Sequence, residues 1–342
     1  MNKGESKPVT IYHIADEAGV SIGTVSRVIN AKGLVSQKTR NRVQKVIQKY
    51  NYSPSQTAQS MVHKKSKSVG ILIPQIRNPF FAQVVGDIDK KLYQHGYSML
   101  LYNCEFSPER ELRAVDDILG RNADGIIFLS TGITEQTISE KIRNRIHAVA
   151  ACSGIPEVDS IDVTNRQAFF DITEHLISLG HRDIAFVGGN AYTSSQVAER
   201  TNGYFDALRK HGIPIREDIL FYKSGGNDNL TLLETKKMLA LKRPPTAIVA
   251  MNDYNAIDTY QAISEMGLRV GRDIAVTGCD NIPFSAIMSP GLTTIDLSIG
   301  LIAEMIADFL LKRMLSDDGS KPREVIIPGK LIKRESSGRM RA

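Results

Sequence analysis

Residues 10–30 read TIYHIADEAGVSIGTVSRVIN, and this stretch predicts two short helices joined by a tight turn. In the first helix, four apolar residues recur at intervals of three and four and form one buried stripe, Ile11, Ile14, Ala15 and Ala18. Thr10 is placed to cap the start of this helix, and Gly19 is placed to end it in the left-handed conformation that glycine adopts at low cost. The stretch therefore predicts a helix-turn-helix unit.

The second helix has two unlike faces. Ser21 is placed to cap it, and its buried stripe consists of Val25, Val28 and Ile29. The opposite face carries small residues near the start and an arginine, which suits insertion into the major groove of DNA. The candidate DNA contacts in this stretch are Thr10, Ser21, Ile22, Gly23, Thr24, Ser26, Arg27 and Asn30.

A third helix completes the predicted head, residues 1–54. Ser36 is placed to cap it, and its apolar residues again follow helical spacing, at Val43, Val46, Ile47 and Tyr50. It would close a three-helix core and end before Pro54.

Residues 55–67 form the predicted hinge and linker. A helix over residues 55–62 is too short to be stable alone in water. Two interpretations stay open: a flexible linker, or a hinge that becomes helical when DNA and a second subunit stabilise it. In the second case Met61 is placed to act as an apolar wedge in the minor groove.

The positive charge is concentrated in the same part of the chain. Residues 1–68 contain twelve Lys or Arg and three acidic residues, a net charge of +9, whereas the whole chain carries +6. A basic terminus alone could serve solubility. Together with the helix-turn-helix it indicates binding to the phosphates of double-stranded DNA.

Composition and motifs argue against several classes of protein, namely membrane proteins, secreted proteins, metalloproteins and enzymes. The chain has 42% hydrophobic and 23% charged residues, with no apolar run near the roughly 20 residues of a membrane span and no signal-peptide core at its start. Cys104, Cys152 and Cys279 have no metal-ligand spacing, so free thiols in a reducing cytoplasm are expected. No Walker loop, nucleophile-elbow serine or HExxH motif is present, and the seven histidines are scattered; His181 is expected in a loop or cap. We therefore expect no enzyme activity, metal or cofactor.

The body, residues 68–342, alternates short apolar runs with amphipathic helices. The candidate strands are Ser68–Pro74, Tyr97–Asn103, Asp124–Ser130, His147–Cys152, Asp183–Gly189, Ala247–Asn252 and Asp273–Asp280. Alternation of this kind predicts an α/β body with doubly wound parallel sheets, and the number of strands favours two lobes. Ligands of such sheets bind beyond the carboxyl ends of the strands.

Nearly the whole chain resembles the LacI/GalR family of bacterial transcriptional regulators. The similarity runs from the head through VSQKTRNRV, GILIPQIRNPFFAQVVGDI, ADGIIFLS, HLISLGHRDIAFVGG, ERTNGYFDAL, PPTAIVAMNDYNAI and SPGLTTIDLS, in the family's order. The resemblance implies an all-α head on two lobes like those of periplasmic sugar-binding proteins, joined by three crossovers. It places lobe 1 at about 68–163 plus 293–324, and lobe 2 at about 164–292 plus 325–342.

The resemblance also implies where a small effector binds. Arg200 in ERTNGY matches the arginine that holds the effector, and Asp280 in GCDN matches the carboxylate at the opposite wall. Asn252 in MNDYNA and Phe81 in NPFF match further pocket residues. A guanidinium and a carboxylate can bind vicinal hydroxyls or an acid, and an aromatic face suits a sugar ring or a base. Taken alone, these residues also fit a surface arginine, a helix cap before Pro283 and a core phenylalanine.

Departures from the family pattern refine these expectations. The usual Arg-Ser-Leu of the hinge is Gln59-Ser60-Met61, and the usual Asp-Asn before the central helix is Thr164-Asn165. Asn227 stands where some members place an aromatic residue over the ligand, which favours a sugar or sugar phosphate over a purine. In the head, Ile22 and Gly23 favour contact with a thymine methyl group, which leaves Arg27 to recognise guanine.

The sequence thus predicts a ligand-responsive repressor of a carbohydrate operon, in the cytoplasm at the nucleoid. It would bind a pseudo-palindromic operator as a homodimer, or as a tetramer, without contact to a membrane. An alternative within the same family is control by a phosphocarrier protein as corepressor, or a role as a global carbon regulator.

Overall fold

The chain divides into two compact units, residues 1–66 and 67–342, which we call the head and the body. The computed structural model describes residues 9–29, 33–52, 65–129, 135–151, 155–189, 195–223, 230–316 and 319–338. Several sequence-based expectations lie outside these residues, namely the hinge helix at 55–62, Asn30, Met61, Cys152 and Asn227.

The head contains the three predicted helices, α1 (Ile11–Glu17), α2 (Ile22–Ile29) and α3 (Gln37–Lys49). Their buried residues form one core, Ile14, Ala15, Ala18, Val25, Val28, Val43 and Val46. The serine caps are confirmed: Ser21 Oγ accepts a hydrogen bond from the N–H of Thr24, and Ser36 Oγ accepts one from the N–H of Thr39, each at 3.2 Å. Gly19 ends α1 with a φ of +61°, as predicted.

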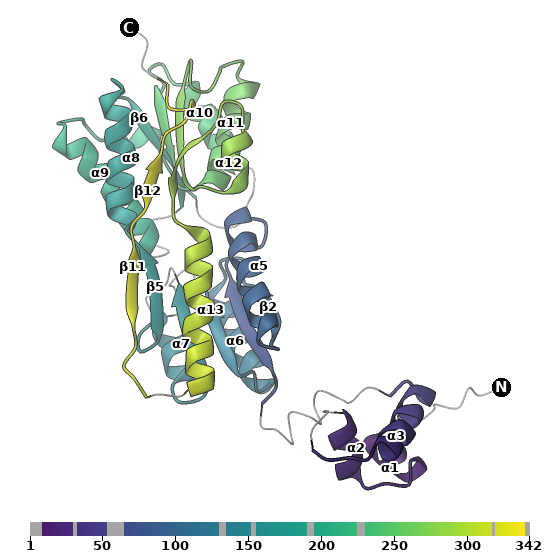
Figure 1. Ribbon diagram of the computed structural model, residues 1–342. Coiled ribbons are helices and arrows are strands. Elements are labelled where there is room, and N and C mark those ends of the chain that lie inside the picture. Colours follow the sequence, from purple (N-terminus) through teal and green to yellow (C-terminus); the bar gives the residue numbers. More distant parts are fainter. Residues whose placement is uncertain are drawn as a thin grey trace. The chain divides into compact units, whose positions relative to one another are not determined.

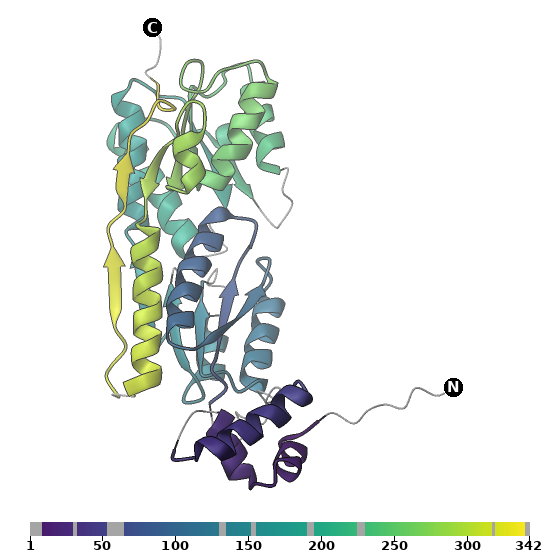
Figure 2. The same ribbon diagram turned by 45° about the vertical axis from the view of Figure 1, so that its right-hand side comes forward.

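The first lobe of the body is built on a parallel sheet of six strands (Figures 1 and 2). In spatial order the strands are β11 (Glu324–Ile327), β5 (Asp159–Val163), β4 (His147–Ala151), β3 (Gly125–Phe128), β1 (Ser68–Ile73) and β2 (Ser98–Asn103). Helices α6 (Pro108–Gly120) and α7 (Glu135–Ile142) pack on one face, and α5 (Pro79–Gln94) and α13 (Ile299–Ser316) pack together on the other.

The second lobe repeats this plan. Its strands, in spatial order, are β12 (Lys330–Ile332), β10 (Thr293–Asp296), β9 (Ala275–Asp280), β8 (Ala247–Ala250), β6 (Ile184–Gly189) and β7 (Leu220–Lys223). Only β12 runs antiparallel among these described strands. One face carries α8 (Asn165–Ser178) and α9 (Ser195–Lys210), and the other carries α10 (Leu230–Leu239) and α11 (Asp253–Glu265). The short α12 (Pro283–Ile287) follows β9, and a 3₁₀ turn, Glu217–Ile219, precedes β7.

The strand pairing corrects two of the expected lobe boundaries. Residues from 293 were expected in the first lobe, but β10 pairs with β9 in the second sheet, so the chain crosses over after Asp296. Residues from 325 were expected in the second lobe, but β11 pairs with β5 in the first sheet, so the return follows Ile327. The lobe boundaries therefore lie after these two strands and not before them, because each strand belongs to the sheet whose neighbour satisfies its backbone hydrogen bonds.

All seven strands proposed from the sequence are present, each within two residues of its predicted ends. Cys104 and Cys279 are buried free thiols, as expected. Among the described residues, no helix combines the length and apolar character that a membrane crossing would require.

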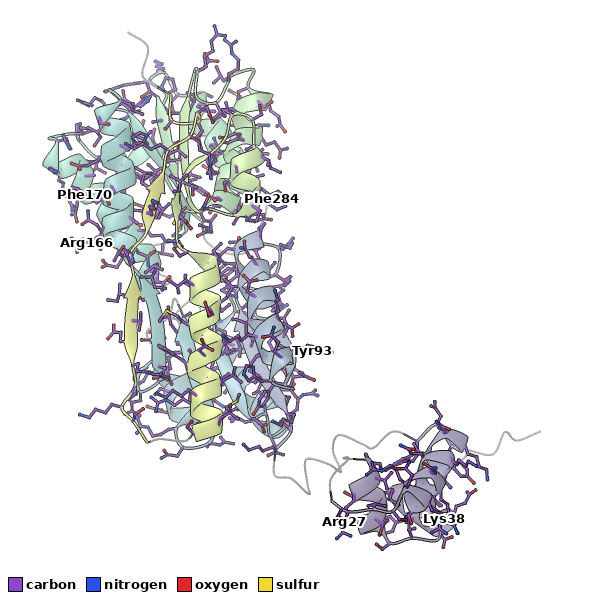
Figure 3. All side chains as sticks on the ribbon, viewed as in Figure 1. Arg27, Lys38, Tyr93, Arg166, Phe170 and Phe284 are labelled. Atoms are coloured by element: carbon purple, nitrogen blue, oxygen red, sulfur yellow. The ribbon has the colours of Figure 1, made fainter. Side chains whose placement is uncertain are left out.

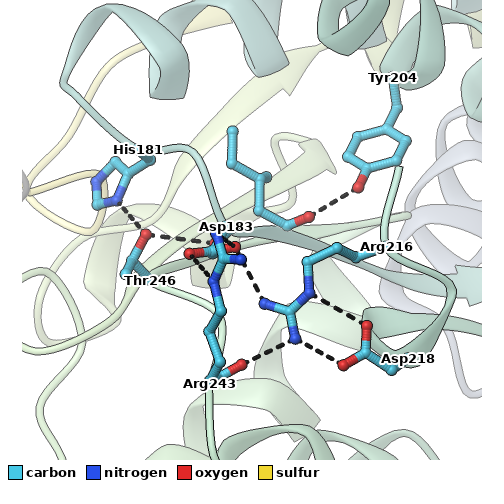
Figure 4. Close-up of polar contacts among 8 residues, drawn as sticks. His181, Asp183, Tyr204, Arg216, Asp218, Arg243 and Thr246 are labelled. Atoms are coloured by element: carbon cyan, nitrogen blue, oxygen red, sulfur yellow. Dashed lines mark hydrogen bonds and ion pairs between the residues drawn. The ribbon is translucent and has the colours of Figure 1, made fainter. Parts of the chain in front are cut away.

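A polar cluster lies at the amino-terminal end of β6, the end opposite to the carboxyl end where ligands are expected (Figure 4). Asp183 accepts hydrogen bonds from Arg216 Nη1 and Arg243 Nε, each at 3.0 Å. His181 is almost fully buried, with Nδ1 3.0 Å from Thr246 Oγ1 and Nε2 2.8 Å from the carbonyl oxygen of Gly338. His181 therefore anchors Gly338, where the described part of the body ends, in accord with the predicted loop or capping role.

The burial of His181 makes the stability of the body dependent on pH. Burial lowers the pKa of His181, and the hydrogen bond to the Gly338 carbonyl opposes this only in part. Because the folded pKa lies below the unfolded value near 6.5, protonation favours unfolding, and stability is lost as the pH falls below about 6.5. Replacing His181 with glutamine should flatten the curve of unfolding free energy between pH 7 and 5 by up to about 1.4 kcal/mol per pH unit. Urea denaturation at a series of pH values tests this, and equal slopes in both proteins would contradict it.

Candidate functional sites

The DNA-facing candidates gather on α2 and its borders. Ser21, Ile22, Gly23 and Arg27 are exposed, while Thr24 and Ser26 are half-buried beside them. The aliphatic stem of Arg27 lies against Gly33, where an added Cβ would come within 3.4 Å of Arg27 Cδ. Figure 3 shows Arg27 on this small domain together with Lys38 of α3. The head thus presents a polar and basic helix face over an apolar core, as groove insertion requires.

Thr10, also a candidate DNA contact, has a structural role at the start of α1. It is the N-cap residue of α1, and its N–H donates to Nδ1 of His13 at 3.2 Å. His13 here occupies the position of the glutamate in a capping box. Thr10 is exposed, and its Oγ1 also lies 2.9 Å from Nδ1 of His13.

In the body, the structure brings Arg200 and Asp280 together. Arg200 comes from α9 and Asp280 from the carboxyl end of β9, yet Nη2 of the arginine lies 4.0 Å from Oδ1 of the aspartate. Both are buried, with exposed fractions of 9% and 3%. The surface-arginine interpretation is therefore wrong, and the pair lies where doubly wound sheets bind their ligands.

Three further groups fix the guanidinium of Arg200. Its Nε donates to Asn165 Oδ1 at 2.7 Å, and its Nη1 donates to the carbonyl oxygen of Met251 at 2.8 Å. Its Cζ lies 5.4 Å from the ring centroid of Phe169. A guanidinium held in this way has a fixed orientation, which is what bidentate recognition of a hydroxyl pair or an acid needs.

Asp280 is in an unusual electrostatic environment. Burial raises the pKa of its carboxyl group, the charge of nearby Asp253 raises it further, and only Arg200 and a hydrogen bond from Cys279 oppose them. Its φ of +116° is a left-handed conformation that an aspartate adopts at a cost. Strain and a perturbed pKa at one residue are typical of functional sites.

Asn252 and Phe81 occupy less direct positions. Asn252 is the N-cap of α11, where its Oδ1 accepts a hydrogen bond from the N–H of Asn255 at 2.8 Å. It follows Met251, whose carbonyl binds Arg200, so it belongs to the same strand end. Phe81 lies on α5 in the other lobe and packs edge-on against Phe80, with ring centroids 5.1 Å apart.

A cavity of about 590 Å³ lies next to Asn165, at the crossover between the lobes. Its lining includes Asp162 of β5, Asn165 of α8 and Gln196 of α9. Gln196 Nε2 donates to Asp162 Oδ1 at 3.0 Å and so joins the two lobes. Ligand pockets typically span 300–1,000 Å³, so a small polar molecule would fit.

Sequence analysis missed three of the supporting groups. Asn165 and the Met251 carbonyl hold Arg200, and Asp253 raises the pKa of Asp280. Their only signal in the sequence is position, since each lies at the start of a helix or directly after a strand. Thr164, where the family usually has an aspartate, accepts a hydrogen bond from the N–H of Gly329 at 3.1 Å and so ties two crossovers together.

Comparison with known proteins matches this architecture. Residues 10–55 match the family model of bacterial regulatory proteins of the lacI family, and residues 173–337 match a periplasmic binding protein-like domain. HTH-type transcriptional repressor PurR of Actinobacillus pleuropneumoniae is 31% identical over 330 residues, which span 96% of this chain and 98% of that protein. The chain belongs to the LacI family. It is a LacI-family DNA-binding transcriptional repressor.

Two other LacI-family proteins are similar along most of their length. Catabolite control protein A of Priestia megaterium is 33% identical over 294 residues, 84% of this chain and 87% of that protein. The Lac repressor dimer bound to operator and the anti-inducer ONPF is 30% identical, with a TM-score of 0.82 and coverage of 97% of this chain and 100% of that one. These matches also confirm the predicted fold class, a helical head followed by two parallel-sheet lobes.

Proposed function

We propose that this LacI-family protein represses a carbohydrate-utilisation operon and binds a sugar or sugar phosphate between its two lobes. The observation that carries the proposal is the buried pair of Arg200 and Asp280, which offers both charge-assisted donors and a carboxylate in one place. Vicinal hydroxyls can donate to the carboxylate and accept from the guanidinium, and a phosphate would pair with the guanidinium. The cavity of about 590 Å³ lies beside this pair and not around it, because its lining includes Asn165, which Arg200 contacts, but neither Arg200 nor Asp280. The proposal therefore rests on the pair itself, and a ligand held between the lobes would change how they meet.

A thermal-shift screen tests the ligand class. Sugars and sugar phosphates are added one by one, and a true ligand must raise the melting temperature because it binds the folded state. Titration with DNA selected from random duplexes then gives the sign of control. Release of DNA by the ligand identifies an inducer, and tighter binding identifies a corepressor. A purine that stabilises the protein while every sugar fails would contradict the proposal.

We further propose that the protein acts as a homodimer on a pseudo-palindromic operator. Large apolar side chains are exposed on α12 and α5, with Ile287 and Tyr93 each 78% exposed and Phe284 49% exposed. Figure 3 shows Tyr93 and Phe284 on the outside of the body. A second copy would bury these residues, and the Lac repressor, which is similar over nearly the whole chain, is a dimer on its operator.

Arg27 is expected to determine base preference. Arg27→Ala should lower affinity for the selected operator about 5- to 150-fold while leaving non-specific affinity nearly unchanged, because a bidentate arginine–guanine contact is worth about 1–3 kcal/mol. The control is Lys38→Ala on the same head, which should weaken binding to all sequences and reduce the salt slope by about 1. Fluorescence anisotropy at several salt concentrations measures both. A uniform loss in Arg27→Ala would instead identify a phosphate contact.

Control by a partner protein is the second candidate. It is favoured by the 33% identity to a protein named catabolite control protein A, a carbon regulator by its name. In that case no sugar alone would change DNA binding, and a phosphocarrier protein added to the titration would. The two candidates therefore give opposite results in the same assay.

A further inference from the structure

The second lobe contains a carboxylate that the proposed effector site does not use directly. Asp253 begins α11 and is completely buried. It accepts hydrogen bonds from the N–H of Ile282 at 3.0 Å, from Ser285 Oγ, and from Thr294 Oγ1 at 2.5 Å. Burial raises the pKa of Asp253 to about 6, against the effect of these donors. A carboxylate is tolerated in the interior only when hydrogen-bond donors surround it, and Ile282, Ser285 and Thr294 provide these donors.

One of these hydrogen bonds fixes the turn that carries Asp280. Asp280 and Asn281 have φ values of +116° and +53°, two consecutive left-handed residues without a glycine. A turn of this kind persists only where the surroundings hold it. Asp253 holds it through the N–H of Ile282, and Arg334 Nη2 holds it through Asn281 Oδ1 at 2.9 Å.

A second hydrogen bond fixes α12. Ser285 lies within this short helix and is fully buried, whereas Phe284 and Ile287 of the same helix are exposed. The carboxylate of Asp253 therefore contacts both the turn of Asp280 and the helix that presents this apolar surface. A displacement of either one changes the hydrogen bonds available to the other.

Strand β9 carries a glycine at the point where the Asp253 carboxylate approaches it. An added Cβ at Gly278 of β9 would lie 2.3 Å from Asp253 Oδ1, so only glycine lets the carboxylate approach the strand this closely. Thr294 of β10 reaches the same oxygen from the next strand. Residues of β9, β10, the turn and α12 thus converge on one side chain.

We propose that Asp253 is a positioning residue, which holds Asp280 in the conformation that contacts the effector and transmits changes at Asp280 to α12. The proposal rests on the proposed effector role of Arg200 and Asp280. Asp253 touches no ligand itself. It acts through the turn at 280–282 and through Ser285.

Hydrogen exchange of the full-length protein tests the positioning without any ligand. Asp253→Asn and Thr294→Val should raise amide exchange in peptides covering 281–288 about tenfold or more, because each removes a buried hydrogen bond to a charged group. Thr294→Ser keeps the hydroxyl and should stay within about twofold of wild type. Peptides covering β1, residues 68–73, should not change. Equal exchange in all proteins, or a uniform rise that includes β1, would overturn the proposal.

A binding experiment with the same variants distinguishes failure of this proposal from failure of the proposed function. D-Ribose, cellobiose and D-glucose 6-phosphate are the probes, and the tightest binder is titrated by calorimetry. Thr294→Val should bind it at least about tenfold more weakly and Thr294→Ser as wild type does, whereas a purely structural role would lower the melting temperature without changing affinity. Equal affinity in Thr294→Val and Thr294→Ser would overturn the transmission to the effector. If wild type binds none of the probes, the proposed ligand class fails, and the exchange experiment still decides the role of Asp253.

Discussion

The Arg200→Ala protein should lose its response to the effector while still binding operator DNA with nearly wild-type affinity. Truncating one member of a buried charge pair costs about 2–5 kcal/mol, so effector affinity should fall at least about 30-fold. The hydrogen bonds of this side chain to Asn165 and to the Met251 carbonyl lie within the body, whereas the candidate DNA contacts lie in the head. Calorimetry with the ligand and anisotropy with operator measure the two effects separately.

Two further variants sharpen this test. Arg200→Lys keeps the charge but cannot donate at once to Asn165 and to the Met251 carbonyl, so we expect an intermediate loss. Arg209→Ala is the matched control, since Arg209 lies on the same helix, is exposed and pairs with Asp206 at 3.3 Å. It should behave as wild type. If Arg200→Ala loses operator affinity and keeps its effector, the assignment of the pocket is wrong.

Replacing Asp159 with alanine should lower the unfolding free energy of the body by about 3–5 kcal/mol, the typical cost of leaving buried charges without a partner. Asp159 is 2% exposed and receives Arg313 Nη2 at 2.9 Å and Arg323 Nη2 at 2.6 Å. These contacts join β5 to α13 and to the segment before β11, and the guanidinium of Arg323 also stacks 3.8 Å above the ring of Phe309. One substitution therefore loosens both α13 and the segment before β11 in the first lobe.

The control for this prediction is an ion pair of the surface. Glu174 accepts from Lys210 Nζ at 2.6 Å on the outside of α8, and Glu174→Ala should cost no more than about 1 kcal/mol. Denaturant unfolding of both variants gives the comparison. Burial by itself would raise the pKa of Asp159, but the hydrogen bonds from Arg313 and Arg323 outweigh it and hold this pKa well below its usual range. The stabilisation is thus present at neutral pH and is lost as the pH falls below about 4. A loss under 1 kcal/mol in Asp159→Ala would contradict the prediction.

Local sequence signals were sufficient for the head. Its helices are defined by side chains that lie within a few residues of one another, such as Ser36 with Thr39, or Gly19 at the end of α1. The long apolar strands of the body were equally visible. The strands that were missed are β5, β7, β10, β11 and β12. Three of them, β7, β11 and β12, are edge strands, and the other two, β5 and β10, lie next to an edge. None of the five has more than three consecutive apolar residues, so none gives a long apolar run.

The sequence by itself determined the helix-turn-helix, the concentration of basic charge in the head and the two-lobed α/β character of the body, because these depend on periodicity and composition. Only the tertiary structure decided which sheet receives β10 and β11, and that Arg200 meets Asp280 across 80 positions of sequence. It also revealed Asp253, whose donors come from a turn, a helix and a strand. Contacts between distant segments depend on the order of strands in the sheets, and no local pattern encodes that order.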